Sequence, residues 1–438
     1  MEPCHYACGT AEHAIKRREF FSTLGRAGAG VALSSLGLFT RPAVAAELAR
    51  SQKRMLIIYM QGGLSQFESW DPKPGAATGG PFRAIRTSVP GLHISELLPH
   101  TAKVMHHLSL VRSLKTDQKK LDDHPLNEYL LTTGRQRTVG KDDPQLGAVV
   151  AKALDTGRSA LPGYVVIAPN FNFHFNASVN ANSAYLGPRY AGVLLRNGAP
   201  PPFLQRPDSL SENASVSAND LRRKINDRFA LRRRTAETDA YVQSYEQGLE
   251  LTRQRDIFDL TKEPARDHER YGKHDFGRHC LLARRLIEKG ITCVRVTHGN
   301  YDTHADNFSF HFEQLGEFDR PFATLIGDLH DRGLLEHTLV VVLSEFGRTP
   351  VINARYGRDH FSKAWSICLG GVGVQHGAVI GATNKDGTEV TDQPFQSGHL
   401  FHTYLAALGL KSTGRFNVAG QKIPMADPEF GPIDELLA

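Results

Sequence analysis

The sequence predicts an α/β protein of three layers, α/β/α, in which a mainly parallel central sheet lies between helices. Most of six short apolar runs are continuous rather than alternating, which indicates strands covered on both faces. Segments with apolar residues at helical spacing separate them, and Gly290 and Gly333 would end two of these helices. Such alternation is typical of a parallel sheet with right-handed crossovers. The predicted strands are MLIIYM (55–60), LSLVRS (108–113), YVVIA (164–168), ITCVRV (291–296), TLVVVLS (338–344) and AWSICLG (364–370).

The composition indicates one large globular domain. The chain has 438 residues, of which 40% are hydrophobic and 22% are charged, so it can bury a large core. We expect residues 46–438 to form a single α/β domain, because large α/β enzymes often fold this much chain as one unit. The net charge of +6 is small and, apart from one arginine-rich segment, spread along the chain. We therefore expect no nucleic acid as a partner.

The N-terminal segment, residues 1–45, has the features of a twin-arginine export signal. KRREFF (Lys16 to Phe21) precedes a weakly apolar run and then RPAVAA, which offers a cleavage site near Ala45 or Ala46. The alternative is an amphipathic helix or a membrane anchor. An anchor needs about 20 apolar residues, and this run is shorter and interrupted by Gly, Ser and Arg26. We expect the twin-arginine translocation machinery as a partner, no stable membrane span in the mature chain, and a periplasmic or secreted location.

One region departs from the alternation of strands and helices. From about residue 204 to residue 274 the chain is polar and rich in Arg, Glu and Asp, with apolar residues at helical spacing. We expect one or two exposed helices inserted into the sheet domain. The basic run from Arg222 to Arg234 is either a solvated helix face or a binding surface.

Three cysteines follow the predicted signal: Cys280, Cys293 and Cys368. Two of them lie in apolar runs, where a cysteine usually behaves as a small hydrophobic residue. Their odd number argues against a disulfide framework.

Polar clusters follow four of the predicted strands. In open parallel sheets, functional sites form at the carboxyl ends of the strands, so these clusters would share one edge of the sheet. They are Glu68 and Asp71 after 55–60; His174 after 164–168; His298, Asp302, His304 and Asp306 after 291–296; and Glu345, Arg348, Asp359 and His360 after 338–344.

The residue types in these clusters suit a divalent metal ion. Carboxylate oxygens together with imidazole nitrogens favour Zn, Mn or Fe over Ca, which prefers shells of oxygen alone and is the less favoured option. In the motif DTHAD, Asp302, His304 and Asp306 point the same way in an extended backbone, and Asp302 neighbours His298 or Asp306 in a helical turn. Taken alone, this motif is better explained by a loop of capping aspartates and a hydrogen-bonded histidine. The clusters on the other strands favour the metal site.

Two further residues are candidates for a catalytic role. Arg348 lies three residues after Glu345, where its planar guanidinium would clamp an anionic oxygen or form a buried ion pair with Glu345. His124 precedes Pro125 at the start of a predicted helix, where it would contact an anion or a metal or be a structural histidine. The residues alone leave both pairs of alternatives open.

Seven motifs in order carry a resemblance to a known family. They are RREFF, GGLSQFESWDPKP, DDHPLNEYLLTTGR, YGKHDFGRHCLLARRLIEKGITCVRV, GNYDTHADNF, VVVLSEFGRTPVINARYGRDHF and GAVIGATNKDG. In these motifs the chain resembles an uncharacterised family of exported bacterial proteins, the domain-of-unknown-function family 1501. That family resembles the alkaline phosphatase/sulfatase superfamily. The resemblance implies an alkaline phosphatase-like fold, one or two metal ions at the C-terminal edge of the sheet, and transfer or hydrolysis of phosphate or sulfate esters.

The resemblance also implies roles for single residues. Where the superfamily has Ser-Asp-His-Gly after a strand, this chain has SEFG, which keeps a carboxylate as Glu345 and loses the imidazole. The superfamily's nucleophile is a Cys or Ser that opens a helix ending in L-T-G-R, and counting back from LTTGR places that position on His124. The implied metal ligands are Asp302, His304, Glu345, Asp359, His360 and either Glu68 or Asp71. The hydroxyls that could replace the missing nucleophile are those of Ser65, Ser69 and Thr132.

These observations predict an exported, metal-dependent hydrolase of sulfate or phosphate esters, with an anionic ester, for example on a polysaccharide, as substrate. The enzyme would be sulfatase-like without the usual nucleophile: a metal-activated water would attack, His124 would act as acid, base or oxyanion ligand, and Arg348 would steady the developing charge. The alternative is a relative that has lost catalysis and binds a ligand or partner at the cell envelope. A third option is that the helical insertion docks a partner and the sheet is a scaffold.

Overall fold

Eight β-strands form one large sheet. The computed structural model describes residues 52–116, 123–157, 161–169, 181–200, 209–233 and 236–438. Within this sheet only β11 runs against its neighbours, because it is antiparallel to both β4 and β8, so the prediction of a mainly parallel sheet is confirmed. In spatial order the strands are β12 (Val379–Ile380), β4 (Leu108–Leu114), β11 (Trp365–Gly371), β8 (Thr338–Leu343), β1 (Arg54–Met60), β7 (Cys293–His298), β5 (Tyr164–Ala168) and β6 (Val193–Arg196).

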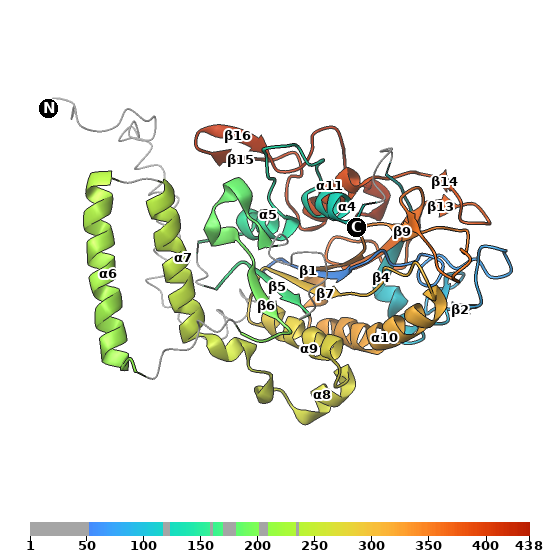
Figure 1. Ribbon diagram of the computed structural model, residues 1–438, viewed down its shortest axis with the longest axis horizontal. Helices are drawn as coiled ribbons and strands as arrows, with labels where there is room; N and C mark the ends of the chain where they lie inside the picture. The colour runs from blue at the N-terminus through green and yellow to red at the C-terminus, as the bar shows by residue number, and fades with distance from the viewer. Residues whose placement is uncertain (1–51, 117–122, 158–160, 170–180, 201–208, 234–235) are drawn as a thin grey trace. The chain divides into compact units, whose positions relative to one another are not determined.

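Helices cover both faces of the sheet (Figure 1). Successive side chains of a strand point to opposite faces. In β1, Leu56 and Ile58 therefore join one core with α9 and α10, and Ile57 and Tyr59 join a second core with α5 and α11. Two buried faces explain why β1 is apolar from Met55 to Met60, and they confirm the three-layer prediction. The helices are α3 (Thr101–Val104), α4 (His124–Thr133), α5 (Leu146–Ala153), α6 (Glu212–Arg233), α7 (Ala236–Arg253), α8 (Ala265–Tyr271), α9 (Asp275–Glu288), α10 (Asn307–Asp331) and α11 (Ser397–Ala407).

In the described part of the chain, four small two-stranded sheets lie outside the main sheet, and all are antiparallel. The pair β9–β10 belongs to the segment that follows β8, so it lies at the edge where the predicted site residues gather. The pairs are β2 (Ala84–Arg86) with β3 (His93–Ser95), β9 (Gly347–Arg348) with β10 (His360–Phe361), β13 (Ala382–Thr383) with β14 (Val390–Asp392), and β15 (Arg415–Val418) with β16 (Gln421–Pro424).

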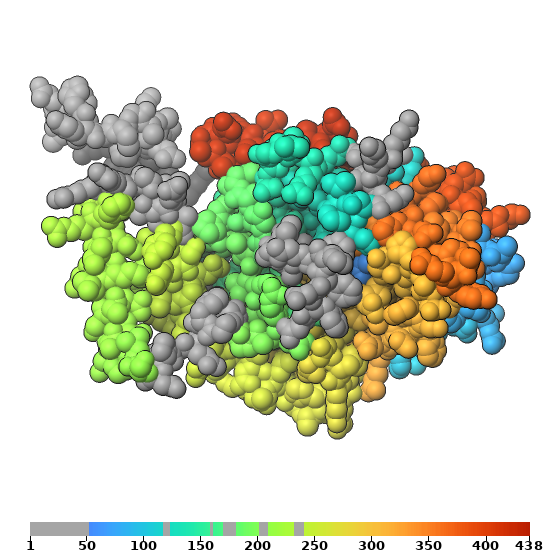
Figure 2. Space-filling view, viewed as in Figure 1, coloured from blue at the N-terminus to red at the C-terminus, as the bar shows by residue number. Residues whose placement is uncertain are grey.

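The polar region 204–274 contains the helices α6, α7 and α8. The surface of α6, yellow-green in Figure 2, includes apolar side chains such as Leu221, Ile225 and Phe229, each at least half exposed. Part of the basic run is used inside this region, because Arg223 pairs with Glu246 of α7 at 2.7 Å. The remaining basic side chains are compatible with either of the two alternatives derived from the sequence.

Residues Lys53–Ala438 form one compact unit. The predicted export signal, residues 1–45, lies outside the described residues. Within the described part of the chain, no helix combines the length and the apolar character that crossing a membrane requires.

The three cysteines lie in the core. Cys280, Cys293 and Cys368 are buried and free of disulfide bonds. Burial raises the pKa of each thiol, which disfavours the thiolate form that binds metals or acts as a nucleophile. They are therefore small hydrophobic residues, as the sequence indicated.

A buried histidine of α10 supports the loop that follows β1. The Nε2 atom of His311 accepts a hydrogen bond from the backbone N–H of Ser65 at 3.1 Å, and Nδ1 lies 2.9 Å from the carbonyl oxygen of Asn307. Because a carbonyl can only accept, Nδ1 carries the proton and the ring is neutral. Burial lowers the pKa of His311 to about 4.

We predict that this histidine makes the protein sensitive to acid. The unfolded chain takes up a proton on His311 near its ordinary pKa of about 6.5, whereas the fold resists protonation until about pH 4. The contribution of the neutral His311 to the free energy of unfolding is therefore complete above pH 6.5. It falls by about 3 kcal/mol in total as the pH is lowered. In urea unfolding, the wild type should lose about 2 kcal/mol more than His311→Gln between pH 7 and pH 5. Equal losses in the two proteins would contradict this assignment.

Candidate metal centre

The candidate centre lies where three neighbouring parallel strands end. In the sheet, β1 lies between β7 and β8 and pairs in parallel with both. The loops that follow these three strands therefore begin side by side, and they carry Gly62, Asp302 and Glu345 respectively. This is the edge at which open parallel sheets form their sites.

Glycine allows the loop after β1 to approach the loop after β7. Gly62 has a φ of +114°, and a Cβ atom there would lie 2.6 Å from the backbone nitrogen of Asp302. A side chain at this position would be strained by the positive φ and would also collide with the neighbouring backbone. The QGGLS motif thus has a steric reason to contain glycine, and it fixes the backbone of Asp302 against β1.

The segment between β9 and β10 folds over the loop after β7. Gly357 lies directly against His304, because a Cβ atom on Gly357 would be 2.1 Å from the His304 carbonyl oxygen. Nδ2 of Asn353 donates to the same oxygen at 3.1 Å. These contacts hold the strand β10, and with it His360, beside Asp302.

The helix α4 brings a third histidine to the same place. Asp123 is its N-cap, and the Asp123 carboxylate accepts the N–H of Leu126 at 3.1 Å. Pro125 follows in the first turn, where its fixed φ suits a helix start. His124 is consequently the first helical residue, and its ring packs against buried Phe346 with the centroids 4.8 Å apart.

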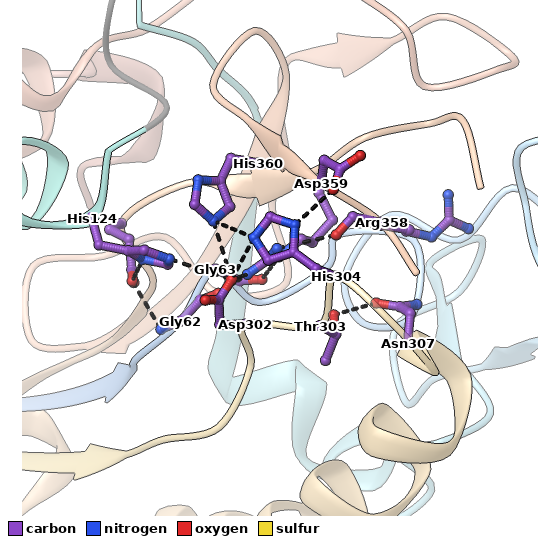
Figure 3. Close-up of polar contacts among 12 residues, drawn as sticks. Gly62, Gly63, His124, Asp302, Thr303, His304, Asn307, Arg358, Asp359 and His360 are labelled. Carbon is purple, nitrogen blue, oxygen red and sulfur yellow. Dashed lines mark hydrogen bonds and ion pairs between the residues drawn. The ribbon is translucent and has the colours of Figure 1, made fainter. Parts of the chain in front are cut away.

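Three imidazoles and one carboxylate converge at this point (Figure 3). Oδ1 of Asp302 lies 3.1 Å from Nε2 of His304, 3.1 Å from Nε2 of His360 and 3.4 Å from Nε2 of His124. The Nε2 atoms of His304 and His360 are 3.0 Å apart. Atoms bound to one tetrahedral zinc ion through bonds of about 2.0–2.1 Å lie roughly 3.3 Å apart. These separations are close to those of atoms that share one ion. Among the described residues, His124, Asp302 and His360 have ligand atoms that all lie within 4.8 Å of one another, and His304 adds its close contacts to Asp302 and His360.

Two of the imidazoles are held from behind by carboxylates. Nδ1 of His124 lies 2.6 Å from Oε1 of Glu345, and Nδ1 of His304 lies 2.6 Å from Oδ1 of Asp359. An ionised carboxylate only accepts hydrogen bonds, so Nδ1 carries the proton and Nε2 of the neutral ring presents its lone pair to the centre. Metal-binding histidines typically have such a carboxylate behind them. Glu345 and Asp359, which we predicted as ligands, instead orient two of the histidines.

This arrangement requires a cation. With a neutral ring, the lone pair of His124 would face the negative Oδ1 of Asp302. Burial disfavours a charged His124, but Asp302 and Glu345 outweigh this effect and raise its pKa to about 9. The pKa of Asp302 is held well below its ordinary value, against the effect of burial, by His124, His360 and Arg348. A divalent ion would satisfy the same charges in place of the proton, so the donor set fits a metal.

Glu345 is a buried charge whose partners all belong to the centre. It is 1% exposed. Oε1 accepts the N–H of Gly62 at 2.8 Å, and Oε2 accepts the hydroxyls of Tyr59 at 3.1 Å and Ser344 at 3.2 Å. Burial would raise the pKa of Glu345, but His124 and the backbone N–H groups of Glu345 and Gly62 lower it. Glu345 therefore stays ionised and keeps the His124 ring in one orientation.

Arg348 has a different position from the one we predicted. Its guanidinium is fully buried and donates to the carbonyl oxygens of Gly62 and Gly63, the latter at 2.9 Å. It also pairs with Asp302 at 2.7 Å, rather than with Glu345. These bonds direct the guanidinium towards the protein, so Arg348 orients Asp302 and the loop after β1 instead of clamping a substrate oxygen.

The two acids after β1 lie in other ion pairs. Glu68 is fully buried and pairs with Arg358 at 3.1 Å, and Asp71 pairs with Lys73 at 3.0 Å. Both were predicted as metal ligands. Their charges are compensated by cationic side chains, so the structure places them as supports of the loops around the centre.

His298 was also predicted as a ligand, but it faces the wrong side of the sheet. It is the last residue of β7 and shares a face with Val294 and Val296, towards α9 and α10. Its Nδ1 atom lies 2.9 Å from the hydroxyl of Tyr301.

Two other residues of the predicted polar clusters are not part of the centre as described. Asp306 is the N-cap residue of α10, and His174 lies outside the described residues.

The hydroxyls that we considered as nucleophiles are buried, and two of them bond to nearby backbone. Ser69 donates to the carbonyl oxygen of Ser65 at 2.6 Å, and Thr132 donates to that of Glu128 at 2.5 Å.

The sequence did not identify Tyr59, whose hydroxyl donates to Glu345. Its signal was weak, because an aromatic residue in an apolar run is indistinguishable from a core residue.

Comparisons with known proteins give weak structural likenesses. The chain is similar to the PsFucS1 sulfatase from Pseudoalteromonas sp., with 14% identity over 91% of this chain and 76% of that one and a TM-score of 0.40. The alkaline phosphatase from the Antarctic bacterium TAB5 gives 11% identity, 82% and 99% coverage and a TM-score of 0.36. The C-terminal periplasmic domain of EcEptC from Escherichia coli, in complex with Zn, is 10% identical over 82% of this chain and 83% of that one, with a TM-score of 0.37. No function is transferred from likenesses of this strength.

The sequence comparisons are more decisive about the family. No curated protein matches the chain. A family model described as "Protein of unknown function (DUF1501)" matches residues 52–437, which is most of the chain and includes every residue of the candidate centre. The chain therefore belongs to the DUF1501 family.

Proposed function

We propose that this protein binds one divalent transition-metal ion at the centre formed by His124, Asp302, His304 and His360, and that it hydrolyses anionic esters there. The observation that carries the proposal is the convergence of three imidazole nitrogens on one carboxylate oxygen, at 3.1 to 3.4 Å. Imidazoles form the majority of the donors, which favours Zn, with Mn second, and disfavours Ca.

When bound, the ion would polarise an ester oxygen and lower the pKa of a water molecule. The remaining roles fall to the chain itself. Glu345 and Asp359 keep the Nε2 atoms of His124 and His304 directed at the centre, and Arg348 holds Asp302. The Asp302 and His304 side chains are 41% and 37% exposed, so the centre is open to a small ligand on one side.

Water is the proposed nucleophile. The family resemblance places His124 where sulfatases have a Cys or Ser, and His124 is committed to Glu345 and Asp302. The class of substrate, a sulfate or phosphate ester, follows from the resemblance to the alkaline phosphatase/sulfatase superfamily. Periplasmic or secreted localisation by the twin-arginine route stays a prediction from the N-terminal motif.

A second candidate function uses the same centre without turnover. The loss of the sulfatase nucleophile favours a protein that binds a metal and a ligand at the cell envelope and no longer hydrolyses it. Both functions require the metal; only the first requires activity.

The metal centre predicts a defined change in metal content. Asp302→Ala and His360→Ala each remove one donor atom, and each should lower the zinc retained after loading and desalting by about one ion per chain. The measurement is elemental analysis of the purified protein. The control is His93→Ala, since His93 is exposed and lies on β3, outside the centre. Equal zinc in all four proteins would contradict the centre.

The carboxylates behind the histidines predict a graded loss of affinity. Glu345→Gln should weaken zinc binding about 10- to 100-fold, because His124 loses its anionic partner. Asp359→Asn is the matched variant at His304, and its effect should be smaller because the Asp359 side chain is 53% exposed and Glu345 is buried. The affinities are measured by competition with a chelating dye. Two unchanged affinities would remove the proposed role of these carboxylates.

The hydrolase proposal predicts metal-dependent turnover. Aryl sulfates and aryl phosphates are offered to the protein with Zn, Mn or Ca added. We expect hydrolysis with Zn or Mn and a loss of more than about 100-fold in Asp302→Ala. Tight zinc binding without turnover of either ester class would favour the second candidate function instead.

A further inference from the structure

A buried ion pair lies one helical turn away from the metal centre. Arg295 is in the middle of β7 and is 1% exposed. It alternates with Val294 and Val296, so its side chain enters the core on the other face of the sheet, which contains Tyr59. Nη2 of Arg295 lies 2.9 Å from Oε1 of Glu128. A buried ion pair seldom stabilises a fold more than apolar side chains of the same volume, so stability alone does not explain this pair.

Glu128 connects Arg295 to the histidine at the start of α4. His124 and Glu128 are four residues apart and therefore lie on the same face of this helix. Of the seven buried residues of α4, Tyr129 and Leu131 are large and apolar, and the others are polar. Apolar packing alone therefore fixes α4 weakly. The ion pair with Arg295 adds a directional contact, one turn after His124.

Tyr59 connects Arg295 to the same histidine by a second route. The Cζ atom of Arg295 lies 4.1 Å from the centroid of the Tyr59 ring, within the range of a cation–π contact. The Tyr59 hydroxyl donates to Oε2 of Glu345 at 3.1 Å, and Oε1 of Glu345 lies 2.6 Å from Nδ1 of His124. The contacts thus form a closed ring that runs from His124 along α4 to Glu128, then to Arg295, Tyr59 and Glu345, and back to His124.

We propose that Arg295 is a positioning residue for the metal centre. It acts through Glu128 on the backbone of α4 and through Tyr59 on the carboxylate of Glu345, so that Nε2 of His124 faces Asp302. A guanidinium suits both tasks, because it is planar and always charged, and can pair with a carboxylate while it stacks on an aromatic ring. The inference rests on the proposed function, since the direction of Nε2 matters only if the centre binds a metal ion.

The first test replaces the ion pair as a whole. Glu128→Met/Arg295→Met leaves no unpaired charge in the core, so its midpoint of urea unfolding should stay close to that of the wild type. We expect its zinc affinity, measured by competition with a chelating dye, to fall about 10-fold or more. Glu263→Met/Arg285→Met is the matched control, because this buried pair lies beside α9 on the other face of the sheet. Equal zinc affinities in the wild type and both variants would overturn the proposal.

The second test removes a single oxygen atom and leaves the ion pair in place. Tyr59→Phe keeps the ring under the guanidinium but takes one donor from Glu345. We expect its zinc affinity to fall about fivefold, as for one lost hydrogen bond. The matched control is Tyr271→Phe, which removes a buried hydroxyl that donates to Asp328 at 3.0 Å in the other core, and its affinity should not change. If both variants bind zinc as the wild type does, Arg295 does not act through Tyr59.

Crystal structures of the metal-free proteins distinguish a failure of this proposal from a failure of the metal centre. Nε2 of His124 lies 3.4 Å from Oδ1 of Asp302, and this distance should lengthen in Glu128→Met/Arg295→Met. If it lengthens although the wild type binds no zinc, the metal centre is wrong and the positioning role of Arg295 stands. If the distance is unchanged, Arg295 does not position His124, whatever the zinc affinity of the wild type.

Discussion

The carboxylate of Glu345 is buried at the carboxyl end of β8, and its charge determines what the rest of the centre must supply. An uncompensated buried carboxylate costs several kcal/mol. The hydroxyls of Tyr59 and Ser344 and the N–H of Gly62 stabilise the charge in part. The positive charge has to come through His124, whose ring lies 2.6 Å from Glu345 on one side and 3.4 Å from Asp302 on the other. A divalent ion beside that ring serves both carboxylates at once.

The fold meets this requirement through neighbouring strand ends and close backbone contacts. Parallel pairing of β1 with β7 and β8 starts three loops side by side. Gly62 and Gly357 then allow these loops to touch the backbone of Asp302 and His304 at distances that no other residue permits. Arg348 joins the loops by donating to the carbonyls of Gly62 and Gly63 and to Asp302. The donors are thus preorganised by the fold, which is how a metal site achieves selectivity by geometry.

The sequence predicted the fold class and the edge of the sheet that carries the site, because both depend on the order of apolar runs and on where polar residues follow them. It also named the residues that meet, among them Asp302, His304 and His360. It could not separate ligands from their supports. Glu345 and Asp359 face the Nδ1 atoms of histidines, whereas Asp302 faces Nε2 atoms. Which nitrogen each carboxylate meets depends on the packing of α4 and of the β9–β10 segment.

Other assignments failed for reasons that also lie in three dimensions. His298 is excluded by the alternation of side chains along β7, once Val294 and Val296 fix the face. Glu68 is compensated by Arg358, which lies 290 residues further along the chain. Such a pairing has no local signal in the sequence.

The most direct test of the central claim is X-ray absorption at the zinc edge, made on the full-length protein loaded with one equivalent of zinc. The account predicts a first shell at about 2.0–2.1 Å with the multiple scattering of three imidazoles, reduced to two in the same protein carrying His360→Ala. A shell of oxygen atoms without imidazole scattering would contradict it.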